Sequence, residues 1–106
     1  MATVKIPPRP ESSIGRAFVK AMKKAHPGWM VVKLKGDGRR DLPDYMVLGD
    51  KDLYGPTMCF LEMKVPGKKP TERQTAMLAD LQDRGFDAAW FDDAEEAVLF
   101  CEESLL

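Results

Sequence analysis

Several residue types that build common active sites are scarce in this sequence of 106 residues. It has one histidine, His26, and two cysteines, Cys59 and Cys101, with no Cys-x-x-Cys pair, which leaves too few nitrogen and sulfur ligands for a structural zinc site. His26 stands in the sequence Ala-His-Pro-Gly, which is typical of a helix end, and a cation at a helix C-terminus is a better interpretation than a catalytic base. No Gly-x-Gly-x-x-Gly or Walker sequence occurs, so neither common nucleotide-binding loop is predicted.

Long apolar segments are also missing. The sequence has no apolar run of about 18 residues, the minimum for a transmembrane helix. Its N-terminal residues, MATVKIPPRPE, are proline-rich and contain no apolar signal core, so a secretory signal is not expected. The two cysteines lie among apolar residues and are predicted to be reduced core residues. We therefore expect a cytoplasmic protein with no membrane contact.

Charge is balanced overall but divided along the chain. The formal net charge is −1 and the pI about 5.8, which taken alone argues against a protein that coats nucleic acid. Residues 1–74, however, contain 15 Lys/Arg and 8 Asp/Glu, whereas residues 75–106 contain one Arg and 9 Asp/Glu. The first part suits an anionic partner and the second suits solvent, although a solvated surface without a partner gives the same pattern.

Hydrophobic periodicity and turn residues predict one α/β domain. The prolines of residues 1–10 favour an extended tail, and residues 11–106 form the single domain. Apolar residues at helical spacing predict a first helix over 11–25, and Thr71 with Gln74 forms the capping box of a second helix that ends at Gly85. Strands are predicted over 29–34, 45–48, 58–64 and 86–91, and a last helix, capped by Asp92 or Asp93, over 94–105. The order α-β-β-β-α-β-α predicts a mixed central sheet flanked by helices.

Two carboxylates come together if the second and third strands form the simplest hairpin. A hairpin folded about Leu53 places Asp44 opposite Glu62 on the neighbouring strand. Like charges that face one another destabilise a hairpin unless a cation neutralises them. Mg²⁺ prefers oxygen ligands and is commonly held by one or two carboxylates together with substrate phosphate. The pair Asp44 and Glu62 therefore predicts a site for a divalent cation.

Alternation along the third strand separates an apolar face from a charged one. Cys59, Leu61 and Met63 are predicted to face the core, whereas Glu62 and Lys64 project together from the other side. An ammonium group beside metal ligands orients a water molecule and stabilises charge that develops on a phosphoryl group. Pro-Asp alone is a common turn and Glu-x-Lys alone a common surface pattern, so the specificity of the signal lies in their combination.

Gln74 and Glu11 are further candidates with more than one interpretation each. Gln74 lies on the apolar face of its helix, and it either caps the helix, or reaches Glu62 and Lys64, or does both. Glu11 begins the first helix and is either an ordinary first-turn glutamate or a third carboxylate for the metal.

Taken in order, these residues resemble those of a known nuclease family. They are Glu11 at a helix start, Gly38-Arg39-Arg40-Asp41-Leu42-Pro43-Asp44, Phe60-Leu61-Glu62-Met63-Lys64, Pro66-Gly67-Lys68-Lys69-Pro70 and Gln74. Over residues 11–97 the sequence resembles the VRR-NUC domain, the virus-type replication–repair nuclease group of the PD-(D/E)xK superfamily, in its stand-alone phage or bacterial form. The resemblance implies a restriction-endonuclease-like core and Mg²⁺- or Mn²⁺-dependent hydrolysis of DNA phosphodiester bonds. It further implies a homodimeric, structure-selective DNA-repair endonuclease that nicks DNA or cuts Holliday-junction-like substrates, in the host cytoplasm if a phage encodes it.

The resemblance also assigns roles position by position. The catalytic residues would be Asp44, Glu62, Lys64 and Gln74. The metal ligands would be Glu11, Asp44, Glu62 and the backbone carbonyl of Met63. Lys64 would position the attacking water or stabilise the transition state, and Gln74 would support Lys64 or the water. Where the family usually has Gly-Val before Pro-Asp, this sequence has Asp41-Leu42, which adds an acid beside the site and removes no motif residue.

Basic residues flank the two motifs and would bind the DNA backbone without reading its sequence. The candidates are Lys33, Lys35, Arg39, Arg40, Lys68, Lys69 and Arg73. Two other interpretations stay open: a catalytically weak nuclease-fold module that binds DNA with a partner repair or replication protein, and a purely structural α/β interaction domain. Leu99 and Phe100 lie off the apolar face of the last helix and mark either a homodimer interface or a broadly buried helix.

Overall fold

Three helices and one four-stranded sheet make up the computed structural model, which describes residues 13–34 and 41–106. In chain order the elements are α1 (Ser13–Ala25), β1 (Met30–Lys33), β2 (Tyr45–Leu48), β3 (Met58–Met63), α2 (Glu72–Asp83), β4 (Asp87–Phe91) and α3 (Ala94–Leu105). The predicted α/β class and element order are confirmed. The predicted tail over 1–10 and the start of the first helix at Glu11 lie outside the described residues.

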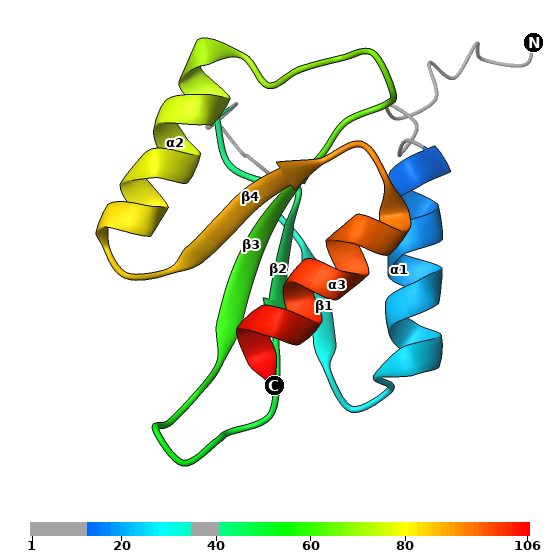
Figure 1. Ribbon diagram of the computed structural model, residues 1–106, viewed down its shortest axis with the longest axis vertical. Helices are drawn as coiled ribbons and strands as arrows, with labels where there is room; N and C mark the ends of the chain where they lie inside the picture. The colour runs from blue at the N-terminus through cyan, green and yellow to red at the C-terminus, as the bar shows by residue number, and fades with distance from the viewer. Residues whose placement is uncertain (1–12, 35–40) are drawn as a thin grey trace, which may run out of the picture.

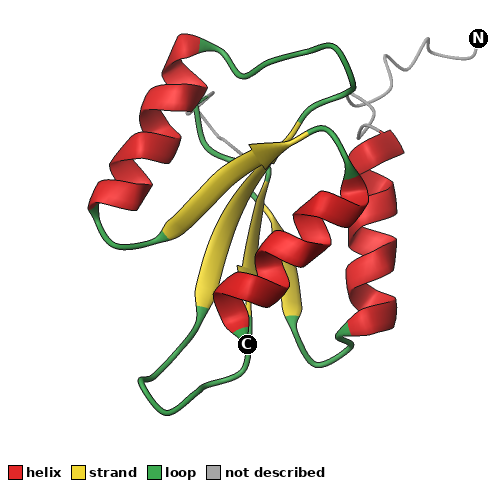
Figure 2. Cartoon of the chain, in the orientation of Figure 1, coloured by secondary structure: helices red, strands yellow, loops and turns green. Residues whose placement is uncertain are grey.

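The strands lie in the order β1-β2-β3-β4, so neighbours in the sheet are also neighbours in sequence (Figure 1). β1 pairs antiparallel with β2 and β2 with β3, whereas β4 runs parallel to β3. A parallel pair requires the chain to cross back between its strands, and α2 lies in that crossover (Figure 2). The crossover brings the first turn of α2 to the C-terminal end of β3, where Gln74 contacts Glu62.

α1 and α3 pack on one face of the sheet, which we call the core face. Its residues in β2 and β3 are at most 5% exposed and alternate along the strands: Tyr45, Val47, Cys59, Leu61 and Met63. The ring of Phe18 in α1 lies against Tyr45 with centroids 5.6 Å apart, and Ala97 and Cys101 of α3 belong to the same cluster. The prediction that Cys59, Leu61 and Met63 face the core is confirmed. We call the opposite face, which carries Phe60 and Glu62, the site face.

The ends of the helices follow from local sequence signals. Thr71 and Gln74 form the predicted capping box of α2, each side chain accepting a hydrogen bond from the other's backbone N–H. Gly85, just after α2, has a φ of +95°, which side chains other than glycine disfavour. Of the two predicted caps for α3, Asp93 is the one that accepts from the N-terminal backbone amides of the helix. No helix within the described residues is long and apolar enough to cross a membrane.

α3 is buried on more than one side. Cys101 Sγ lies 3.7 Å from Cys59 Sγ of β3, and both thiols are buried and free, as predicted. The hydrogen bond to Cys59, together with burial, raises the pKa of Cys101, which favours the unreactive protonated form. Phe100 packs on Phe91 of β4 with ring centroids 5.2 Å apart, whereas Leu99 is 57% exposed. Of the two residues off the apolar face, therefore, only Leu99 faces solvent.

Candidate active site

The hairpin of β2 and β3 has the predicted register. Tyr45 pairs with Leu61 and Met46 with Phe60, and extension of this ladder by one residue places Asp44 opposite Glu62. The backbone N–H of Leu34 donates to the carbonyl of Asp44 at 2.8 Å, so the β1–β2 ladder also continues to this position. Asp44 is therefore held by backbone hydrogen bonding at the point where β2 begins.

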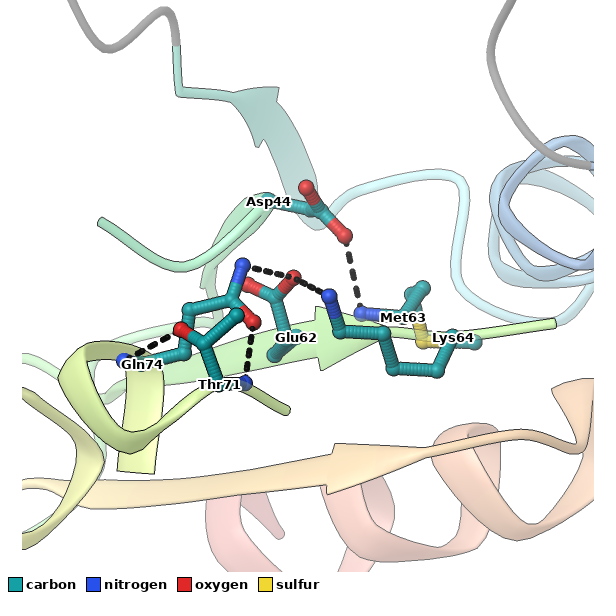
Figure 3. A network of polar contacts seen from close by, with 6 residues as sticks. All are labelled: Asp44, Glu62, Met63, Lys64, Thr71 and Gln74. Carbon is teal, nitrogen blue, oxygen red and sulfur yellow. Dashed lines mark hydrogen bonds and ion pairs between the residues drawn. The ribbon is translucent and has the colours of Figure 1, made fainter. Parts of the chain in front are cut away.

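The carboxylate of Asp44 is tied to the end of β3. Its Oδ2 accepts a hydrogen bond of 2.9 Å from the backbone N–H of Met63 (Figure 3). Met63 directly follows Glu62, so this bond holds the Asp44 side chain beside the second carboxylate. The two acids of the predicted pair come together because of the strand register and this one side-chain contact.

Glu62 is almost fully buried and only partly satisfied. The residue is 3% exposed. Its Oε1 accepts from Gln74 Nε2 at 3.2 Å and lies 3.4 Å from Lys64 Nζ (Figure 3). Its Oε2 is also buried and has no hydrogen-bond partner among the residues that the structure describes. A buried carboxylate oxygen without a partner costs free energy, because such a group loses its hydration and gains nothing in return.

Burial also changes the acidity of Glu62. Desolvation, followed by the negative charge of Asp44, raises the pKa of Glu62 to about 7, and the ammonium of Lys64 opposes the shift. Desolvation disfavours the charged form of a carboxyl group, and a neighbouring carboxylate acts in the same direction. One lysine is thus too little positive charge to keep Glu62 fully ionised at neutral pH.

Gln74 performs both of the roles that the sequence left open. Its Oε1 accepts from the backbone N–H of Thr71, and its Nε2 donates to Glu62 Oε1. The capping bond fixes which way the amide faces, because one end of the amide is held by the helix N-terminus. The other end is then directed at Glu62, as Figure 3 shows.

The donor set suits a hard divalent cation. Asp44 and Glu62 supply carboxylate oxygens, and the buried Oε2 of Glu62 still lacks a partner. Mg²⁺ is commonly bound through one or two carboxylates, with water and substrate phosphate completing its shell. Within the described residues there is no group of three or more His, Cys, Asp or Glu side chains arranged for a metal. Glu11, the predicted third carboxylate, lies outside the described residues.

The predicted DNA-binding residues fall into three sets. Lys68, Lys69 and Arg73 are exposed on the segment that leaves the site at Lys64 and returns to it at Gln74. Lys33 is also exposed, but it pairs with Tyr45 and so shares the core face of the sheet, not the face of Glu62. The prediction that Lys33 flanks the carboxylates is therefore weakened. Lys35, Arg39 and Arg40 lie outside the described residues.

Two features of the site were missed in the sequence. The Met63 backbone was predicted to contribute its carbonyl, yet the contact that the structure shows is its N–H, which binds Asp44. Trp90 is the Cα partner of Glu62 in the parallel β3–β4 pair, so it lies next to the carboxylate on the site face. The strand over 86–91 was predicted, but the register of a parallel pair depends on the crossover helix and not on any local sequence signal.

Asp41, the departure from the family pattern, is half-buried three residues before Asp44.

Comparison with models of known protein families and with curated proteins gives no match. The membership of this chain in the VRR-NUC family therefore stays a prediction from its motif residues. The structure itself shows a small α/β fold in which two carboxylates, a lysine and a glutamine lie together at the end of β3.

Proposed function

We propose that this protein is a divalent-metal-dependent DNA endonuclease with a restriction-endonuclease-like core of the VRR-NUC type. The observation that carries the proposal is Glu62, a carboxylate that is 3% exposed, lies beside Asp44 and keeps one buried oxygen without a partner in the described part of the chain. Such an arrangement destabilises the protein by itself. A bound Mg²⁺ or Mn²⁺ removes the penalty, because it neutralises both acids and supplies the missing partner.

Each residue of the cluster has a distinct part in phosphodiester hydrolysis. The chemistry supplied by a bound divalent cation is neutralisation of phosphate charge and a lowered pKa for a water ligand. Asp44 and Glu62 hold the cation from two adjacent strands. Lys64 places its ammonium where negative charge grows on the phosphoryl oxygens, and Gln74 keeps Glu62 oriented through the amide that the helix cap fixes.

Charge distribution supports a DNA substrate. Lys68 and Lys69 are exposed on the loop that follows the site, and Arg73 is exposed in the first turn of α2, which suits contact with the phosphates on either side of the cleaved bond. α3, which carries four glutamates, packs on the core face and thus on the opposite side of the sheet. These four glutamates therefore do not oppose the approach of a polyanion to the site face.

The described residues form one such site, so simultaneous cleavage of both strands of a junction requires a second copy. We propose a homodimer for this reason, and Leu99, 57% exposed on α3, is a candidate contact. The oligomeric state is measured by light scattering at micromolar concentration. A strict monomer that cuts both strands of a junction symmetrically would contradict the dimer.

The proposed activity is tested by incubating the protein with single-stranded, duplex, flap, junction and supercoiled DNA in Mg²⁺, in Mn²⁺ and in EDTA. We expect cleavage only with metal, and its loss by about 10³-fold or more in Asp44→Asn and Glu62→Gln, since metal-ion catalysis contributes several kcal/mol. Glu103→Gln, a change at an exposed acid of α3, is the matched control and should cleave normally. Undiminished cleavage by both site variants would sink the proposal.

A second function has one specific observation in its favour. Within the described residues only two carboxylates meet at the site, which suits weak metal binding. The alternative is a nuclease-fold module that binds DNA and acts with a partner repair or replication protein. It is distinguished by the same experiment, because such a module binds the DNA panel but leaves every substrate intact in both metals.

A further inference from the structure

A large aromatic side chain lies exposed beside the buried carboxylate. Trp90 of β4 is the Cα partner of Glu62 of β3, and partnered residues of a parallel pair point to the same face of the sheet. Glu62 is 3% exposed, whereas Trp90 is 37% exposed. The two neighbours therefore differ in their access to solvent, and the tryptophan presents surface on the same face of the sheet as the site.

The exposure of Trp90 follows from how α2 packs on β4. Ala88, two residues earlier on the same face, is 4% exposed, and its carbonyl accepts from Gln82 Nε2 of α2 at 2.7 Å. Leu78, the buried residue of α2, is 6% exposed. α2 thus packs close to the small Ala88 and leaves the much larger Trp90 more than one-third open. β4 is an edge strand of the sheet, and the open part of Trp90 gives it an aromatic surface on the same face as Glu62.

We propose that Trp90 stacks on an unpaired nucleobase of the DNA strand whose phosphate lies at Asp44 and Glu62. Neighbouring strands of a sheet are about 4.8 Å apart, which is within the reach of one nucleotide from its phosphate to its base. The stacked base therefore belongs to a nucleotide at the cleaved bond or next to it. This inference rests on the proposed nuclease function and adds the class of substrate that the site selects.

The choice of an unpaired base follows from what each form of DNA exposes. In a duplex both faces of every internal base are already stacked, and only base edges and phosphates face the protein. Single strands, ends and the branch points of junctions expose base faces, on which aromatic side chains stack without regard to sequence. Lys68 and Lys69 on the adjoining loop and Arg73 in the first turn of α2 supply the cations that follow the backbone of such a strand. The combination of cations and one open aromatic ring is complementary to single-stranded nucleic acid.

Tryptophan fluorescence can report the proposed stacking contact, because the sequence has only two tryptophans. The other, Trp29, stacks on His26 with ring centroids 3.8 Å apart, in the turn between α1 and β1. Trp29→Phe leaves Trp90 as the only tryptophan, and Trp90→Phe leaves Trp29 as the matched control. Both are made together with Glu62→Gln, so that the DNA is not cut during the measurement.

The two proteins are titrated with a short oligothymidylate and with a blunt duplex of the same length, and tryptophan fluorescence and the anisotropy of labelled DNA are recorded together. We expect the oligothymidylate to quench Trp90 strongly, the duplex to quench it weakly, and Trp29 to change with neither. Equal quenching of Trp90 by both DNAs, or no quenching while anisotropy reports binding, would overturn the inference.

Affinity gives an independent readout. Trp90→Ala should weaken binding of the oligothymidylate by about 5- to 100-fold, since stacking on an aromatic side chain has that effect per base, and Trp90→Phe should retain most of the affinity. Duplex binding should change by no more than about twofold in either variant, because no base face is involved. Thermal unfolding of the Phe variant confirms that the fold is intact.

These measurements distinguish a failure of the Trp90 proposal from a failure of the proposed nuclease function. If metal-dependent cleavage is present and Trp90→Ala binds single strands as tightly as the wild type, the stacking role is wrong and the nuclease function stands. If no DNA binds or is cut in either metal, both fail. If single strands bind through Trp90 but nothing is cut, the stacking site stands and the endonuclease function fails.

Discussion

The two faces of the sheet bury their central residues to the same degree with opposite consequences. Leu61 on the core face is 0% exposed, and Glu62, the next residue along β3, is 3% exposed on the site face. Burial of the leucine stabilises the fold because apolar surface leaves water. Burial of the glutamate destabilises the fold because a carboxylate loses its hydration and one of its oxygens finds no partner. A single strand therefore carries both a source of stability and a cost.

This difference between neighbours indicates what the site face is for. A fold selected only for stability would place an apolar or exposed residue at position 62. The cost of Glu62 is instead offset in part by Gln74 and Lys64, and the rest is available to a ligand that binds the buried oxygen. Perturbed and incompletely satisfied ionisable groups are typical of functional sites for this reason. The four predictions below test the contrast between the core face and the site face.

The largest expected effect is on the core face. Leu61→Ala should lower the free energy of unfolding by about 2–5 kcal/mol, because the change removes a fully buried side chain and leaves a cavity. Urea unfolding at neutral pH measures this loss. Met46→Ala is the matched control, since Met46 is half-buried on the site face and should cost less. An equal loss at Met46 would show that the two faces are packed alike.

At Glu62, the residue that follows Leu61, we expect a substitution to raise the free energy of unfolding. The pKa of Glu62 is raised from 4.5 to about 7 in the fold, so its stabilising contribution is complete below pH 4.5 and is lost as the pH rises through 7. The free energy of unfolding of the metal-free wild type should thus fall over this interval. At pH 8 the free energy of unfolding of Glu62→Gln should be higher than that of the wild type by up to about 3 kcal/mol. Urea unfolding in EDTA across this pH range measures both effects.

The same measurement contains its own controls. Glu103→Gln, at an exposed position of α3, should differ from the wild type by no more than about 0.5 kcal/mol at every pH. Mg²⁺ should stabilise the wild type more than it stabilises Glu62→Gln, because the neutral amide is a poorer ligand for a hard cation. A Glu62→Gln protein that is less stable than the wild type at pH 8 in EDTA would contradict the cost assigned to this carboxylate.

The contrast between the faces also explains what the sequence could predict. Alternation of apolar residues assigns Cys59, Leu61 and Met63 to the core, and the symmetry of the hairpin about Leu53 brings Asp44 opposite Glu62. Both are local properties of β2, β3 and the turn that joins them. The element order and the capping box at Thr71 follow from equally local signals.

Contacts that depend on long-range packing were beyond such reasoning. The parallel register that places Trp90 beside Glu62 depends on how far α2 carries the chain before β4 begins. The sequence likewise assigned no face to Lys33, because its side of the sheet depends on the pairing of β1 with β2 and not on its position before the Pro-Asp motif. The unsatisfied oxygen of Glu62 likewise results from the packing of several elements around one atom.

A smaller effect separates the two roles of Gln74. Gln74→Ala should lower the free energy of unfolding by about 1–2 kcal/mol, since it removes a capping contact and a hydrogen bond to a charged group. Thr71→Ala, the control, removes the other bond of the capping box, from the Gln74 backbone N–H to the Thr71 hydroxyl, and keeps both side-chain bonds of Gln74, so it should cost about 1 kcal/mol. Cleavage activity should fall with Gln74→Ala and change little with Thr71→Ala. Equal losses of activity would mean that Gln74 acts only through the helix cap.

The smallest effect tests whether the site face alone meets the polyanion. Replacement of Lys68, Lys69 or Arg73 by Gln should lower the slope of log affinity against log salt for single-stranded DNA by about 0.7 per residue, with a modest loss of affinity each. Lys23 and Lys24 of α1 are the matched controls, because they are equally exposed but lie on the helix that packs against the core face. If their replacement changes the salt slope as much, DNA contacts both sides of the protein. The charge division along the sequence would then reflect a diffuse electrostatic surface and not one binding face.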